Sequence, residues 1–505
     1  MKRSTLSSTK LASPAARAKR ALAGASFSLI AAFLLMSLSA SRASADVGVV
    51  LNETLDVSVA RITGSGHTAV YFSRICPESP VRLRLCRPGE EGSVMSNYIN
   101  LGEDQPFEWN IVPLSVYVYG VQEPRYRPLF GSEKIKAALE DRYRDGMLSA
   151  YCTSQGCKTS DKSEWREMAG AGLSRSMYIF VVETSVQQDL DLIEKFNALP
   201  NENHFNGVTN NCADFTKGII DSYFPHSAHR DYINDFGMTS PKAVARSFTH
   251  YAESHPEARF RVLHFSQLPG TIKRSSEAHS GTEQLYHSKK LLVPMVVFAD
   301  HELVVAAAAY ALTGRFNPEH EFEKHPAVQD AATVQVSLAM SENGGGSSDE
   351  FDAIESQDRG QIVGTSDEWN AYRTEFDAIV AEAVREEIIP RRRYLKSVFK
   401  RLDATPTADA NGSMWLEISD GSGHSRVGLS ANNILAPDSD ARLAYQLLLA
   451  RTQYVLKSPK HSRETMLEFK EDWALLQYAR TRCLGPLAES AAPAATAAPQ
   501  AAAAN

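Results

Sequence analysis

The chain has 505 residues, of which 43% are hydrophobic and 22% are charged, a composition typical of globular proteins. This length is sufficient for two or three domains, each with its own core. The formal net charge of -7 is modest and no domain-sized basic region occurs, so we expect no nucleic acid partner. Clustered basic residues lie next to apolar stretches instead, which indicates membrane association.

Residues 1–45 have the pattern of a secretory signal peptide with a long basic head. Basic residues precede an apolar run from Ser26 to Ala40, and Ala43, Ser44 and Ala45 supply small residues before Asp46. We expect export to the periplasm or cell envelope, with cleavage after Ala45 or retention of the segment as an N-terminal anchor.

Six cysteines in an exported chain favour disulfide formation. Two pairs are close in sequence, so we expect the bridges Cys76–Cys86 and Cys152–Cys157. Cys212 and Cys483 then remain free.

The pattern between residues 46 and 272 predicts one α+β domain. Period-two stretches predict strands at Ala69–Phe72, Val81–Leu85 and Val116–Tyr119, and further strands at Met177–Val182 and Phe260–Phe265. Helical spacing predicts helices at Lys134–Leu148, Glu164–Leu173, Val186–Phe196 and Pro241–Ala252.

The second half of the chain changes in character. Residues 273–340 contain the apolar stretch Leu291–Thr313, interrupted by Asp300, His301 and Glu302. A bilayer span, a helical hairpin and a buried core helix all remain open for it, because central polar residues are costly in a membrane. We expect a flexible acidic linker at 341–366, a small helical domain with a β-hairpin at 367–485, and a disordered Ala/Pro tail at 486–505.

One stretch has the pattern of a nucleophile site. A polar Asn- and Gly-rich loop from 203 to 211 is followed by a helical pattern, with Phe215, Ile219 and Tyr223 on one face. Cys212 therefore lies in the first helical turn, where the helix dipole favours a thiolate. The alternative is that Cys212 is a small buried hydrophobic residue without a chemical role.

A base for this thiol is found near the N-terminus. His67 follows Gly66 at the start of a predicted strand, on the same face as Ala69 and Tyr71. Its imidazole would take the thiol proton if the fold brings the two side chains together. The alternative is a structural histidine at a strand end.

The strand with Gly66-His67 and the later Asn211-Cys212-x-x-Phe215 helix start resemble the circularly permuted papain-like (NlpC-type) superfamily. The nearest resemblance is to the Lnb-type N-terminal periplasmic domain family of bacterial envelope proteins. The resemblance covers roughly residues 47–270 and implies a cysteine nucleophile, Cys212, with a histidine base, His67, acting on amides or esters.

No third catalytic residue follows from the resemblance, since Val81–Leu85 offers only arginines where such families place a polar residue. Four residues are candidates for a supporting role: Glu108 and Asn110 as orienters of the histidine, and His204 and Asn211 beside the thiol.

Metal sites are not expected. His226, His229, Asp231 and Asp235 have ligand types but lack a Cys/His quartet spacing. His301-Glu302 and His320-Glu321 begin like zincin helices, but Val305 and Lys324 stand where the second histidine is needed. We therefore expect neither a metal nor a cofactor.

These patterns predict an exported, membrane-associated cysteine hydrolase or acyltransferase that forms a thioacyl intermediate. Cell-wall peptide is the favoured substrate and a lipid is the other candidate. The alternative is a non-catalytic envelope protein that uses a papain-like fold for binding or assembly. The sequence leaves the oligomeric state open.

Overall fold

The computed structural model describes residues 44–55, 65–98, 107–148, 168–202, 204–232, 234–235, 237–287, 315–327, 362–409, 412–420, 423–457 and 464–485. A seven-stranded sheet has the order β6-β5-β2-β1-β7-β8-β9. Its strands are β1 Ser44–Asn52, β2 His67–Phe72, β5 Ser93–Ser96, β6 Asn110–Pro113, β7 Met177–Ser185, β8 Arg261–Phe265 and β9 Pro326–Ala327. Strands β3 (Ile75–Ser79) and β4 (Arg82–Leu85) form a separate two-stranded sheet.

The sheet is mixed. β1 and β2, β2 and β5, β5 and β6, and β7 and β8 pair antiparallel, whereas β8 and β9 pair parallel. Helices accompany these strands, so the predicted α+β class is confirmed. The papain-like connectivity stays a proposal.

Side chains of β2 alternate between two hydrophobic cores, as the period of a strand requires. Val70 and Phe72 belong to one core, which also contains Ala213 and Ile219 of helix α6, and we call it the α6-side core. The opposite α2-side core contains Ala69 and Tyr71 together with helix α2. The sheet is therefore covered on both faces.

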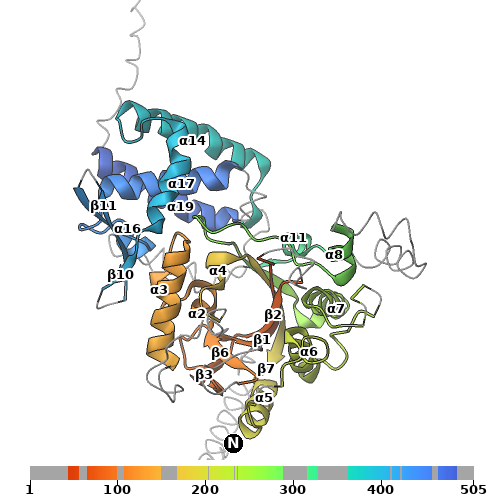
Figure 1. Ribbon diagram of the computed structural model, residues 1–505. Coiled ribbons are helices and arrows are strands. Elements are labelled where there is room, and N and C mark those ends of the chain that lie inside the picture. The colour runs from red at the N-terminus through yellow and green to blue at the C-terminus, as the bar shows by residue number, and fades with distance from the viewer. Residues whose placement is uncertain are drawn as a thin grey trace, which may run out of the picture. The chain divides into compact units, whose positions relative to one another are not determined.

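Several helices follow the strands in the first half of the chain. They are α2 Leu114–Tyr119, α3 Glu133–Tyr143, α4 Ala171–Ser174, α5 Val186–Ala198, α6 Cys212–Tyr223, α7 Pro241–Glu253, α8 Gly281–His287 and α11 Pro318–Lys324. Serine side chains cap α5 and α7, since Ser185 accepts from Gln188 N–H and Ser240 from Ala243 N–H. Figure 1 shows α6 and α7 together beside β7.

One strand prediction is wrong. Val116–Tyr119 lies in helix α2, which follows Pro113 and ends at Gly120 with a left-handed φ of 72°. The alternation of valine and tyrosine suggested a half-buried strand, but all six residues of α2 are buried. Alternating residue types therefore did not correspond to alternating exposure.

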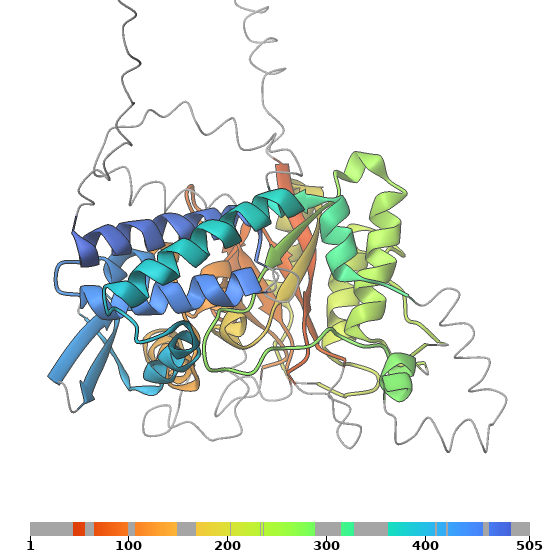
Figure 2. The same ribbon diagram turned by 90° about the horizontal axis from the view of Figure 1, so that it is seen from above.

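The C-terminal part contains the predicted helices and hairpin. Its elements are α14 Ser366–Arg385, α15 Leu395–Val398, α16 Ala431–Ile434, α17 Ala441–Lys457, α19 Met466–Leu484, and the sheet of β10 Pro406–Ala408, β11 Met414–Asp420 and β12 Gly423–Gly428. Figure 2 shows the three long helices α14, α17 and α19 side by side.

This C-terminal part shares its core with the sheet. The described residues from Ala45 onward belong to one unit, and the α2-side core runs from β2 to α19. Hydrogen bonds also join the two regions: Leu129 N–H donates to the backbone oxygen of Leu429 at 2.7 Å, and the Arg451 side chain donates through Nη1 to Leu129 O at 2.6 Å. Residues on both sides of the predicted boundary at residue 367 thus contribute to the same hydrophobic core.

Several predicted features lie outside the described residues: the signal segment up to residue 43, the apolar stretch at 291–313, most of the linker, the tail and the Cys152–Cys157 pair. Within the described ranges, none of the helices combines the length and the apolar character that a membrane crossing requires.

Candidate functional site

Cys212 is the first residue of helix α6, as the sequence predicts. Asn211 caps this helix, and its Oδ1 accepts from Ala213 N–H at 2.8 Å and from Asp214 N–H at 3.1 Å. The Asn211 Nδ2 donates to Thr239 O at 3.1 Å, which fixes the loop against the segment before α7. Asn211 thus positions the helix start through its cap.

The electrostatic environment of the thiol differs from the prediction. Cys212 is free and partly exposed, but burial of the sulfur raises its pKa to about 11. Backbone N–H groups of Thr68, Ala213 and Cys212 itself lower this pKa, while Asp214 raises it. Desolvation raises the pKa of the thiol more than the N–H groups at the helix start lower it, so the expected thiolate near neutral pH is not found.

His67 begins β2, directly after Gly66, whose φ of 71° favours glycine. The His67 side chain is buried, and its ring stacks on Tyr98 with centroids 4.1 Å apart. Its Nε2 is hydrogen-bonded to Ser96 Oγ at 2.7 Å. Burial, followed by the charge of Arg175, lowers the His67 pKa well below its usual value, so the imidazole is neutral at pH 7.

The His67 ring and the helix that carries Cys212 pack on opposite faces of the sheet. His67 lies two and four residues before Ala69 and Tyr71 in β2, so strand alternation places its side chain on the same face as theirs. Its ring stacks on Tyr98, which belongs to the α2-side core. Helix α6, which carries Cys212, packs on the other face in the α6-side core. No hydrogen bond joins His67 to Cys212, and neither group perturbs the pKa of the other.

The supporting candidates also divide between the faces. Asn110 begins β6 opposite Ser96, so it lies on the His67 side, and both its side-chain polar atoms are buried without a hydrogen-bond partner in the described chain. Glu108 Oε1 accepts from Asn210 Nδ2 at 3.4 Å, near the thiol loop. His204 is exposed, and its backbone oxygen accepts from the same Nδ2 at 3.0 Å.

Sequence reasoning missed Ser96 and Tyr98, which contact the His67 ring. Their proximity depends on the register between β2 and β5, which no local motif encodes. It also missed Arg175, whose charge lowers the His67 pKa. Another residue that it missed is Asn97, which directly follows β5. The Asn97 side chain is fully buried, and both its polar atoms are without a hydrogen-bond partner in the described chain.

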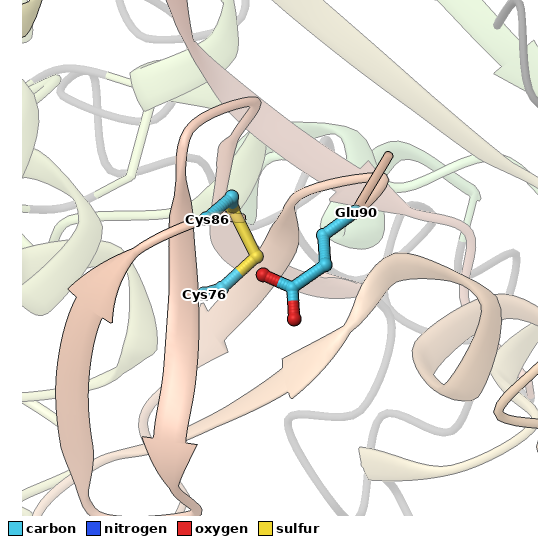
Figure 3. A group of neighbouring side chains, drawn as sticks. All are labelled: Cys76, Cys86 and Glu90. Atoms are coloured by element: carbon cyan, nitrogen blue, oxygen red, sulfur yellow. A yellow bond between two sulfur atoms is a disulfide. The ribbon is translucent and has the colours of Figure 1, made fainter. Parts of the chain in front are cut away.

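The cysteine predictions are confirmed where the structure describes them. Cys76 and Cys86 form a disulfide, and Cys483 is free like Cys212. Figure 3 shows the Glu90 carboxylate beside this disulfide. Glu90 accepts two hydrogen bonds from Arg84, at 2.6 and 2.7 Å, so its charge already has a protein partner.

Two groups of metal-ligand type occur among the described residues. One is the Cys76–Cys86 bridge with Glu90, whose sulfurs are bonded to each other. The other joins Glu253, Glu321 and His325, with ligand atoms within 4.8 Å of one another. The Lys324 ammonium lies 3.1 Å from Glu321 and 3.8 Å from Glu253, so a protein cation occupies the position that a metal would take.

The histidine-rich turn at 226–235, which was not expected to bind a metal, has protein partners for its acidic side chains. Asp231 forms an ion pair with Arg246, and Asp235 accepts from Ser240 Oγ at 2.6 Å. His229 donates its backbone N–H to Ser247 Oγ at 2.9 Å. These contacts account for the acidic residues of the turn.

No protein-family model, curated protein or solved structure matches the chain. The functional reading therefore depends on the geometry of its own residues.

Proposed function

We propose that this chain is a non-catalytic binding or assembly protein of the cell envelope, built on a papain-like arrangement. One observation carries the proposal: the His67 ring stacks on Tyr98 of the α2-side core, whereas helix α6, which begins with Cys212, packs in the α6-side core. His67 is engaged by Ser96, and the Cys212 thiol has a pKa of about 11 because it is buried. At neutral pH such a thiol is protonated and is a weak nucleophile.

The proposed location is the periplasm or cell envelope, with membrane association and a cell-wall peptide or lipid as partner. Two observations support it: the signal-like segment 1–45 and the Cys76–Cys86 disulfide, which belongs to an oxidising compartment. Fractionation followed by a carbonate wash tests location and membrane association together, since a peripheral protein is released and an integral one is retained.

Alkylation of Cys212 tests the proposed function. The rate of iodoacetamide labelling is measured against pH in a Cys483→Ser background, with peptide mapping to assign the label. We expect an apparent pKa well above that of an ordinary cysteine, about 8.5. We also expect the same value in His67→Ala, since no hydrogen bond joins this imidazole to the thiol.

A cysteine hydrolase or acyltransferase is the second candidate. One observation favours it: Cys212 is free and begins a 12-residue helix, with the Thr68 and Ala213 N–H groups acting on the sulfur. Such N–H groups are suited to an oxyanion. A burst of nitrophenol from p-nitrophenyl acetate that is lost in Cys212→Ser would support this candidate, and a linear progress curve in both proteins would exclude it.

A further inference from the structure

A cavity of about 670 Å³ lies away from Cys212 and His67. Elements distant in sequence form its walls: β7, β8, α11, the first turns of α14, the end of α17 and the start of α19. Its volume is within the range of small-molecule sites, about 300–1,000 Å³.

Aromatic rings form one part of the lining. The His264 ring lies 4.6 Å from that of Tyr178 and 5.5 Å from that of Phe322, centroid to centroid. Trp369 of α14 also lines the cavity. Burial and the nearby Arg274 lower the His264 pKa to about 3, so the imidazole is neutral and this part of the wall is uncharged. These rings suit an apolar side chain.

Positively charged side chains of α14 and α17 line the cavity. Arg373 Nε donates to Leu456 O at 2.9 Å, and Arg373 Nη1 donates to Asn370 Oδ1 at 2.8 Å. These bonds fix the guanidinium and leave Nη2 without a hydrogen-bond partner among the described residues. Lys457, the last residue of α17, also lines the cavity. Ser366 adds the N-terminal end of the 20-residue helix α14, which favours an anion.

Negatively charged side chains of α11 also line the cavity. Glu319 and Glu323 lie one helical turn apart on this helix, and both line the cavity. The remaining acid, Glu464, is bonded to Arg451 at 3.2 Å, and burial raises its pKa, so it adds little net charge. The cavity wall thus has carboxylates on α11, cations on α14 and α17, and aromatic rings.

We propose that this cavity binds a zwitterionic amino acid or short peptide with an apolar side chain. The ligand carboxylate pairs with Arg373 and Lys457, its ammonium group pairs with the α11 carboxylates, and its side chain packs on Tyr178, Phe322 and Trp369. A guanidinium held by two protein acceptors is preorganised for a carboxylate. This inference rests on the proposed binding function and names its ligand class.

The dipeptide alanyl-phenylalanine tests the inference by isothermal titration calorimetry with the full chain. We expect saturable binding that weakens about tenfold or more when the peptide carboxylate is amidated, because a charge-assisted hydrogen bond is lost. N-acetylation weakens binding as well. Arg373→Gln is expected to weaken binding of the free dipeptide and to reduce the difference in affinity between the free and the amidated peptide, since Lys457 remains as a carboxylate partner.

Arg385→Gln is the matched control, since Arg385 is on the same helix, is exposed and does not line the cavity. This control is expected to bind like the unmodified chain. No saturable binding of any of the peptides, or equal affinities in Arg373→Gln and Arg385→Gln, would overturn the inference. Thiol alkylation reports on the proposed function separately: a low Cys212 pKa would refute the non-catalytic role without changing dipeptide affinity.

Discussion

Replacing Ser96 by alanine tests the environment of His67. Ser96 Oγ lies 2.7 Å from His67 Nε2 and both side chains are buried, so the variant leaves a buried ring nitrogen without this partner. A buried polar group that loses its partner costs about 1–3 kcal/mol. The free energy of unfolding, measured by urea denaturation, is therefore expected to fall by that amount.

The same variant has a second readout, the apparent pKa of Cys212 in the alkylation assay. We expect no change, because Ser96 and His67 contact each other beside the α2-side core, whereas helix α6, which begins with Cys212, packs in the α6-side core. Ser254→Ala is the control: Ser254 is exposed and bonded to Tyr251 O. Its effect on stability is expected to stay within about 0.5 kcal/mol. A Ser96→Ala variant that lowers the Cys212 pKa would refute the opposite-face arrangement.

Three further predictions concern stability. Asn211→Ala removes the cap of α6 and is expected to cost about 0.5–2 kcal/mol by urea denaturation, whereas Asn211→Asp, which keeps a capping oxygen, costs less. Arg451→Met leaves the buried carboxylates of Glu464 and Asp472 without their cation and is expected to lower the free energy of unfolding by about 3–5 kcal/mol. Because the core is continuous, far-UV circular dichroism and tryptophan fluorescence are expected to report one common unfolding transition. Burial lowers the pKa of His264 to about 3 in the folded chain, against an ordinary value of about 6.5, so only the unfolded state gains a proton between these values. Stability falls as pH drops through that window, by up to about 5 kcal/mol, and His264→Leu is expected to remove this contribution from the pH profile.

Local features of the site were predictable because they depend on short stretches of chain. Cys212 at a helix start follows from the polar loop before it and the helical spacing after it. The face of His67 also follows locally, since strand alternation puts it with Ala69 and Tyr71. The Cys76–Cys86 bridge followed from the short sequence separation of the two cysteines in a chain expected to be exported.

The relation between the two residues was not predictable. It depends on which face of the sheet α6 covers, and this is decided by the packing of Ile219 and Ile220 against Val70 and Phe72. The pKa of Cys212 depends in turn on that packing, because burial outweighs the helix start. Tertiary burial also explains the error at Val116–Tyr119, where a local pattern of valine and tyrosine lies inside a fully buried helix.

The apparent pKa of Cys212 is the most direct test of the central claim that His67 does not activate this thiol. The measurement is the pH dependence of iodoacetamide labelling at Cys212 in the Cys483→Ser chain and in its His67→Ala variant. The structure predicts the same value, near 11, in both proteins. A value below about 7 that rises when His67 is removed would show a thiolate–imidazolium pair and contradict the claim.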